Sequence, residues 1–171
     1  MSAGWKKDKE WSDRFLPEMK RICGENLIGE PPVAEDQERN TDLMVLKMEA
    51  VRIAARVRHP DAWLKWPNEF TIRMGRPTGT KTEFTKIMEG WGDYLLYGFA
   101  DPTETHLIAW RLISLNEFRI WIVRYMFEHG GKLPGSPQKN TDRSSDFHAF
   151  PLWEAPTSLL LADHDPRREA A

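Results

Sequence analysis

The chain has 171 residues, of which 40% are hydrophobic, and its 24 basic and 26 acidic residues give a formal net charge of −2. This length suits one globular domain with a buried core and is too short to predict two. The small net charge excludes attraction of nucleic acid by the overall field, so such binding requires a local basic patch. The single cysteine, Cys23, excludes an internal disulfide. Without an apolar leader or a run of ~18 apolar residues, the sequence predicts a cytoplasmic protein with no membrane partner.

The first predicted element is a helix over residues 11–23, preceded by a charged segment, residues 1–10, that we expect to be loose. Its apolar residues recur with the period of a helix face that packs on a sheet. They are Trp11, Phe15, Met19 and Ile22. Because Pro17 lies inside this stretch, the helix is either bent there or begins near Leu16. Gly24 is a typical helix terminator, and the glycine-, proline- and acid-rich stretch after it predicts a loop.

Two strands joined by a tight turn are predicted next, over Thr41–Lys47 and Ala50–Arg58, because apolar and polar residues alternate with period 2. The alternation in the second strand places Arg52, Arg56 and Arg58 on one face. Guanidinium groups are costly beside a dry core unless they meet carboxylates, phosphates or water. This strand therefore predicts either an anion-binding surface or a network of ion pairs.

A third strand, Glu69–Arg73, alternates in the same way. Phe70 and Ile72 are expected to point inward, so that Arg73 extends the arginine face on the opposite side. The turn-rich stretch that follows carries two further cations, Arg76 and Lys81.

The second half of the chain begins with a long predicted helix over residues 81–99, with Thr82 as its N-cap. Its apolar stripe consists of Phe84, Met88, Trp91 and Leu95. A central fourth strand is predicted over His106–Leu112, and a closing helix over Leu115–Glu128. Proline, serine and charged residues then predict an irregular tail, residues 132–171, that a few apolar islands fasten to the domain.

The resulting order of elements predicts one α/β domain over residues 11–131. Its sheet is expected to be mixed and four-stranded, with the first three strands in a meander and a crossover helix before the fourth. This α-β-β-β-α-β-α order resembles the restriction-endonuclease-like PD-(D/E)xK nuclease superfamily over residues 11–129.

Two positions carry that resemblance further. Asp42 heads a strand, and twelve residues later the acid-x-Lys tripeptide position reads Ala54-Ala55-Arg56. Alanine cannot bind a metal ion, and arginine keeps its proton near neutral pH. The resemblance therefore implies a nuclease-like fold with a degenerate active site.

The chain is also similar to uncharacterised proteins encoded by bacteriophages and prophages. The similar segments are ERNTDLMVL, VRIAARVR, EFTIR and TEFTKIMEGWGDYLLYGFAD. This second resemblance implies a phage or mobile-element origin within a bacterial host cell, and it brings no catalytic residue with it.

One hypothesis is a metal-dependent nuclease, or a descendant that still acts on nucleic acid. Such an enzyme needs two or three carboxylates to hold Mg²⁺, which binds the scissile phosphate and activates water. The candidate catalytic residues are Asp42, Glu69, Glu83 and Lys86, of which Asp42 and Glu69 are the candidate metal ligands. No other cofactor is indicated. The alternative is that these acids form local caps and solvated ion pairs of small value.

A second hypothesis is a non-catalytic module whose cations bind the phosphates of nucleic acid by bidentate contacts. The candidate residues are Arg52, Arg56, Arg58, Arg73, Arg76 and Lys81. Acids are abundant nearby, so an internal network of ion pairs explains the same arginines equally well. The candidate acids are Asp36, Glu38, Asp42, Glu49 and Glu69.

A third hypothesis is an interaction protein that binds or inhibits a host or defence protein, or joins a phage assembly. It requires a contiguous patch of exposed aromatic residues. The candidates are Trp63, Trp66, Trp91, Tyr94 and Tyr97. The alternative is that Trp91 belongs to the core and that the others are half-buried.

Overall fold

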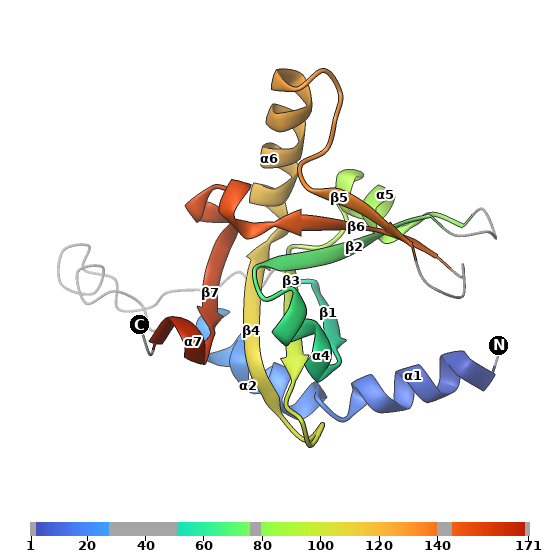
Figure 1. Cartoon of the computed structure of the whole chain (residues 1–171), viewed down its shortest axis with the longest axis vertical. Helices are drawn as coiled ribbons and strands as arrows, with labels where there is room; N and C mark the ends of the chain where they lie inside the picture. Colours follow the sequence, from blue (N-terminus) through green and yellow to red (C-terminus); the bar gives the residue numbers. More distant parts are fainter. Residues whose placement is uncertain (1–2, 28–50, 76–79, 140–144, 170–171) are drawn as a thin grey trace, which may run out of the picture.

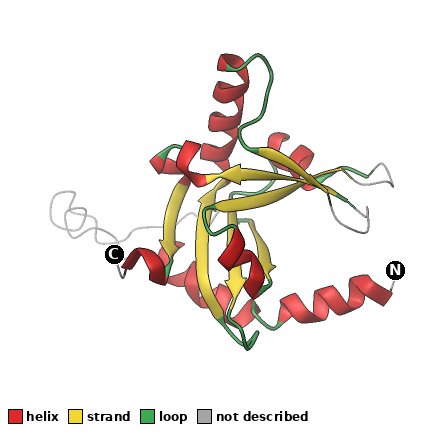
Figure 2. Ribbon diagram, in the orientation of Figure 1, coloured by secondary structure: helices red, strands yellow, loops and turns green. Residues whose placement is uncertain are grey.

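The computed structural model describes residues 3–27, 51–75, 80–139 and 145–169. It shows a mixed α/β arrangement with two sheets, whose strands run in clearly different directions in Figures 1 and 2. The helices are α1 (Ala3–Asp13), α2 (Leu16–Leu27), α4 (Pro60–Lys65), α5 (Glu83–Met88), α6 (Leu115–Glu128) and α7 (Pro166–Glu169). The strands are β1 (Ile53–Arg58), β2 (Glu69–Gly75), β3 (Tyr94–Ala100), β4 (Leu107–Ser114), β5 (Ser136–Lys139), β6 (Asp146–Pro151) and β7 (Leu160–His164). The 3-10 turns η1 (Leu152–Glu154) and η2 (Thr157–Leu159) lie between β6 and β7.

The large sheet has the strand order β1-β3-β4-β7, with β1 parallel to β3 and the other neighbours antiparallel. The small sheet is antiparallel, in the order β2-β6-β5. The predicted mixed four-stranded sheet is thus confirmed. The predicted meander is wrong in the described part of the chain, because β2 pairs with β6 and not with β1. The predicted strand Thr41–Lys47 lies outside the described residues.

The main core lies between the two sheets and is closed by α6 (Figure 1). Phe70 of β2 is fully buried there, with ring-centroid distances of 5.9 Å to Phe118 of α6 and 5.5 Å to Phe150 of β6. Such aromatic pairs add about 0.5–1.5 kcal/mol each beyond the burial of area. The inward prediction for Phe70 and Ile72 is confirmed, and the closing helix has the predicted bounds.

A second core lies on the other face of the large sheet, where α2 packs. The predicted apolar stripe provides Phe15, Met19 and Ile22, which pack against Leu96, Ala100, Leu107 and Leu112. The helix begins at Leu16, so Pro17 lies in its first turn, where its missing N–H costs nothing. Gly24 does not end the helix, which continues to Leu27. Residues 3–10, expected to be loose, belong to α1.

The sequence prediction is wrong over much of residues 81–99. Thr82 caps a helix as predicted, but α5 is only six residues long. Gly90 and Gly92 follow it with φ of 93° and 84°, a left-handed conformation that glycine adopts without strain and that ends a helix. The chain then forms β3, in which Leu95–Ala100 is buried throughout. A strand covered on both faces has no polar alternation, and its apolar run imitates a helical stripe.

The segment predicted as an irregular tail supplies strands to both sheets. β6 is the central strand of the small sheet, and β7 is an edge strand of the large one. The apolar islands contribute as predicted, because Phe150 and Leu159 are both fully buried. The prediction of an irregular tail is therefore wrong, since its short strands find their partners far away in the sequence.

A buried ion pair fixes the segment that follows β7. Arg111 of β4 is fully buried, and its Nη2 donates to Asp165 Oδ2 at 3.1 Å and to the Pro67 carbonyl at 2.6 Å. Arg167 donates to the same Asp165 oxygen at 3.2 Å. Burial acts to raise the pKa of Asp165, but hydrogen bonds from Arg167 and the charges of both arginines outweigh it and lower that pKa. The pair thus joins the C-terminal segment to the loop before β2.

Candidate functional site

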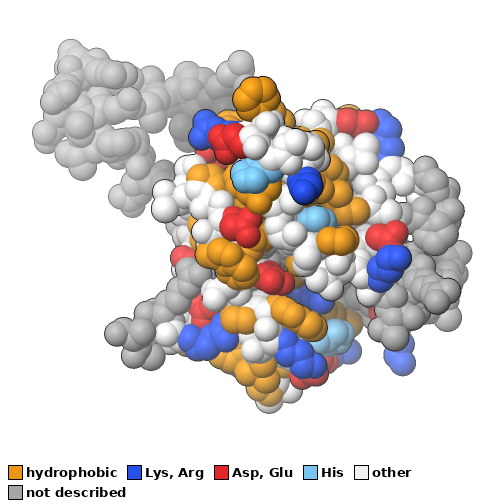
Figure 3. Space-filling view, turned by 45° about the horizontal axis from the view of Figure 1, so that its top comes forward, with side chains coloured by type: hydrophobic (Ala, Val, Ile, Leu, Met, Phe, Trp, Pro, Cys, Tyr) orange, Lys and Arg blue, Asp and Glu red, His pale blue; other side chains and the backbone are white. Residues whose placement is uncertain are grey.

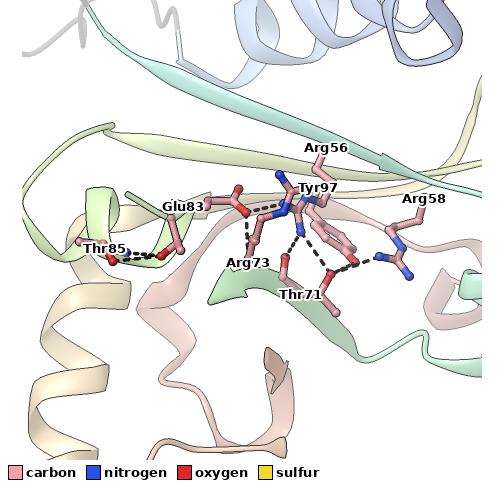
Figure 4. Close-up of polar contacts among 8 residues, drawn as sticks. Arg56, Arg58, Thr71, Arg73, Glu83, Thr85 and Tyr97 are labelled. Atoms are coloured by element: carbon pink, nitrogen blue, oxygen red, sulfur yellow. Dashed lines mark hydrogen bonds and ion pairs between the residues drawn. The ribbon is translucent and has the colours of Figure 1, made fainter. Parts of the chain in front are cut away.

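Three arginines gather between β1 and β2, which are edge strands of the two sheets (Figure 4). Arg56 and Arg58 project from β1, and Arg73 projects from β2, as the alternation of both strands predicts. The polar groups between them belong to Thr71 and Tyr97. We name the whole set the arginine cleft; it consists of Arg56, Arg58, Thr71, Arg73, Tyr97 and Phe147.

Arg56 is held by its own chain. Its Nη1 donates to the Thr71 carbonyl at 2.7 Å, and its Nη2 forms a salt bridge with Oε2 of Glu83 on α5. The same carboxylate oxygen accepts a hydrogen bond from the backbone N–H of Arg73 at 3.1 Å. The side chains of Arg56 and Glu83 are only 17% and 24% exposed, so this pair is less screened than a surface pair. Arg56 thus has an acidic partner within its own chain, but this partner is Glu83 and not one of the five acids predicted for the network.

Arg58 differs from Arg56 in having no acidic partner among the described residues. Its Nη1 lies 3.4 Å from the Thr71 hydroxyl, which also shares a hydrogen bond of 3.2 Å with the Tyr97 hydroxyl. The residue is half-buried and faces a cavity on each side. Glu69 forms no ion pair with the described residues, and the other predicted acids, at positions 36, 38, 42 and 49, lie outside them. Arg58 is therefore available to an anion from outside the chain.

Phe147 of β6 lies beside two of the guanidinium groups. The Cζ atoms of Arg56 and Arg73 are 5.4 Å and 5.3 Å from its ring centroid. These cation–π distances are favourable, and the ring keeps the two cations near each other against their mutual repulsion. The cleft therefore holds its positive charge in place before any ligand is bound.

Three cavities meet at the arginine cleft and together form a trough. One of about 260 Å³ lies beside Arg58 and Phe147. One of about 670 Å³ opens between the cleft and α1, and one of about 410 Å³ extends toward α5. The first two share Arg58 and Phe147 as wall residues, and the last two share Arg56 and Arg73. Residues of the arginine cleft thus line all three cavities.

The walls of this trough carry eight basic and four acidic side chains, although the whole chain has a net charge of −2. The basic residues are Lys7, Arg52, Arg56, Arg58, Arg73, Lys81, Lys86 and Lys139, and the acidic ones are Asp8, Asp61, Glu69 and Glu83. Two exposed tryptophans, Trp66 and Trp91, also line it, and the Arg52 guanidinium lies 5.7 Å from the Trp91 ring centroid. The predicted cations Arg52 and Lys81 thus belong to the same surface, while Arg76 lies outside the described residues.

The predicted catalytic residues do not come together in the described part of the chain. Glu69 and Glu83 line different cavities, and Glu83 is already engaged by Arg56. Lys86 is exposed near Glu83, and Asp42 lies outside the described residues. Among the residues that are described, no group of three acids, histidines or cysteines is placed to hold a metal ion.

Sequence reasoning missed three members of the cleft. Thr71 was available to it, because it lies between Glu69 and Arg73 on the polar side of the same strand. Tyr97 and Phe147 were missed because they fell in a predicted helix and a predicted tail. Only the pairing of β3 and β6 with distant strands brings these two residues to the arginines.

The five aromatic candidates for a protein-binding patch do not form one exposed cluster. Tyr97 is buried, and the ring of Trp63 is covered by the Arg167 guanidinium, whose Cζ is 4.2 Å from the ring centroid. Trp66 and Trp91 are exposed but line different cavities of the trough. On the face shown in Figure 3, apolar side chains are interspersed with charged and polar ones.

Comparison of the chain with protein-family models, with curated proteins and with solved structures gave no match. Within the described residues, every helix is too short or too polar to cross a lipid bilayer.

Proposed function

We propose that the protein binds nucleic acid, without cleaving it, through the trough centred on the arginine cleft. The proposal depends on the burial of Arg58 and on its lack of an acidic partner among the described residues. Its guanidinium is half-buried, has no acidic partner among the described residues, and lies where two cavities of a basic trough meet. A partly desolvated guanidinium is best satisfied by a planar or tetrahedral oxyanion that accepts two hydrogen bonds, and phosphate is such a group.

The composition of the trough favours a polyanion over a single small anion. Basic residues extend from Lys139 at one end to Arg52 and Lys86 at the other, so several phosphates of one chain have a cation within the same depression. Exposed Trp66 and Trp91 lie along it, and a basic groove with aromatic platforms is typical of surfaces that bind nucleic acid strands. The phage or prophage context implied by the sequence resemblance is retained as part of the proposal.

Catalysis is not part of the proposal, because the candidate carboxylates among the described residues do not converge on one point. A nuclease of the PD-(D/E)xK type needs carboxylates that converge on a metal ion, and Glu83 is instead bonded to Arg56 and to the Arg73 backbone. Incubation with single- and double-stranded DNA and RNA in Mg²⁺ or Mn²⁺ tests this point. We expect no cleavage, and metal-dependent cleavage that Glu83→Gln removes would restore the nuclease hypothesis.

Binding is tested by fluorescence anisotropy with labelled oligonucleotides over a series of salt concentrations. The logarithm of the affinity should fall linearly with the logarithm of the salt concentration, by about 0.7–0.9 for each phosphate contact. Arg58→Ala should weaken binding and reduce this slope by about 1. Arg21→Ala is the matched control, because Arg21 is exposed on α2, outside the trough. The proposal fails if wild-type protein binds no oligonucleotide, or if the two variants behave alike.

A further inference from the structure

The smallest cavity of the trough has the dimensions of a pocket for one nucleobase. Its volume of about 260 Å³ lies just below the ~300–1,000 Å³ of sites for drug-sized ligands. Aromatic side chains make up much of its wall, from Trp66 at the surface to buried Tyr97 and Phe99. Arg58, the cation without an acidic partner in the described chain, lines the same pocket and continues into the next cavity. A flat apolar ligand with a phosphate attached would pack against the aromatic side chains and place its phosphate near Arg58.

Glu69 gives the pocket a specific polar group. It lies at the start of β2, two residues before Thr71 and on the same face of the strand, and it lines the pocket. The side chain is half-buried, and its carboxylate accepts no hydrogen bond from the described residues. A ligand that fills the pocket would displace water from this carboxylate, so a ligand that brings N–H groups to it is favoured over one that does not.

The nucleobases differ in the donors that they offer to a carboxylate. Guanine has two adjacent donors on its Watson–Crick edge, the N1–H and the 2-amino group, which match the two oxygens of a carboxylate. Adenine and cytosine present one amino group beside a ring acceptor, and thymine and uracil present one N–H between two carbonyl oxygens. In a duplex this edge is occupied by the opposite base, so a protein reads it only in a single strand.

We infer that this pocket takes an unpaired guanine of a single-stranded nucleic acid, with Glu69 on the Watson–Crick edge of the base and Arg58 on an adjoining phosphate. The inference rests on the proposed function and narrows it to a strand type and a base. Trp66, which is 51% exposed at the pocket, provides a stacking surface for the base.

The test compares four labelled probes by anisotropy at one salt concentration. They are a short oligo-dT, the same strand with one central guanine, the same strand with inosine in place of guanine, and the guanine strand annealed to its complement. A bidentate base contact discriminates by about 1–3 kcal/mol, so the guanine strand should bind about 5- to 150-fold more tightly than oligo-dT. Inosine, which lacks the 2-amino group, should fall between them, and the duplex should lose the guanine preference.

Glu69→Gln supplies the second measurement, with thermal melting to verify its fold. This variant should bind oligo-dT at least as tightly as wild type, because the trough loses a negative charge, while its preference for guanine disappears. Glu25→Gln, which changes an exposed carboxylate on α2, is the matched control and should keep the preference.

The outcomes separate the two proposals. Equal wild-type affinities for the guanine and oligo-dT strands, together with a normal salt slope, would overturn the base pocket and leave the proposed function standing. Tighter binding of the duplex, or a guanine preference that persists in Glu69→Gln, would also overturn the inference. Failure of every probe to bind would overturn the proposed function and the pocket with it.

Discussion

The Glu83→Gln substitution should move stability and affinity in opposite directions. The amide side chain keeps the shape of the carboxylate, and its oxygen is still able to accept the hydrogen bond from the Arg73 N–H. What is lost is the negative charge opposite Arg56, because the oxygen that accepts from Arg56 and from Arg73 is still an acceptor in the amide. A hydrogen bond between two charged, mostly buried groups, worth about 1.5–3 kcal/mol, thus becomes a weaker one between a cation and a neutral amide. We therefore expect the free energy of unfolding to fall by about 1–2 kcal/mol, against ~0–1 kcal/mol for an exposed ion pair.

The affinity for nucleic acid should rise in the same variant. Glu83 contributes one of the four negative charges of the trough, and it occupies a guanidinium that would otherwise face the ligand. Removing the charge releases Arg56 for a phosphate, and one added phosphate contact should steepen the salt slope by about 0.7–0.9. Urea denaturation measures the first effect, and anisotropy over a salt series measures the second.

A matched control separates these effects from the general loss of a carboxylate. Glu25→Gln breaks another arginine–glutamate pair, with Arg21, in which both side chains are more than half exposed and lie outside the trough. It should change stability by less than about 1 kcal/mol and leave the salt slope unaltered. A Glu83→Gln variant that loses stability and binds no more tightly would refute the view that Glu83 competes with the ligand for Arg56.

Three further substitutions test the fold. Gly92→Ala should destabilise the protein by more than ~1 kcal/mol, because φ is 84° and the new Cβ would lie 2.9 Å from Leu115 Cδ1. Gly24→Ala, in a helix with open space around the position, should instead raise the free energy of unfolding by about 0.5–1 kcal/mol. Changes of the same sign for the two variants in urea denaturation would contradict this reasoning. Asp165→Asn should lower stability by about 3–5 kcal/mol, because it removes the charge of Asp165 from a buried salt bridge with Arg111; a loss below ~1 kcal/mol would contradict this. Since the pKa of Asp165 is lowered on folding, its contribution is present above the ordinary pKa and is lost as pH falls below it; melting temperatures from neutral to acidic pH should therefore drop less steeply in Asp165→Asn.

Local signals account for the elements that the sequence predicted well. The closing helix was placed at Leu115–Glu128 because its apolar stripe has a helical period and Gly130-Gly131 follows it. Pro17 indicates a start of α2 near Leu16 as one of two alternatives, and the alternation around Phe70 and Ile72 indicates the inward side of β2. In each case the deciding residues are within one or two turns of the element, so no tertiary information was needed.

The errors arise where a distant partner decides the structure. β3 is covered on both faces, so its sequence lacks the polar alternation that would have separated it from a helix. β2 was paired with the strand nearest in sequence, whereas its true neighbour is β6. Short strands such as β5 and β7 carry too few residues to show a period at all.

The sequence predicts only part of the candidate site, because some of its contacts also come from residues that are distant in sequence. The alternation of β1 and β2 was sufficient to place Arg56, Arg58 and Arg73 on one side. It was not sufficient to tell which arginine has an acidic partner, because Glu83 reaches Arg56 from a helix in another part of the fold. The proposed function depends on the difference between Arg56, which pairs with Glu83, and Arg58, which has no acidic partner among the described residues, and only the tertiary structure shows that difference.

The late position of β6 and β7 in the chain has a consequence for biosynthesis. Residue 70 pairs with residue 150, and residue 110 pairs with residue 164, so both sheets are completed only after β6 and β7 have been synthesised. A nascent chain that has reached only the end of α6 exposes the unpaired edges of β2 and β4 and the aromatic face that packs against Phe150. Contacts so distant in sequence form slowly, and we expect chaperones that shield those edges to aid folding.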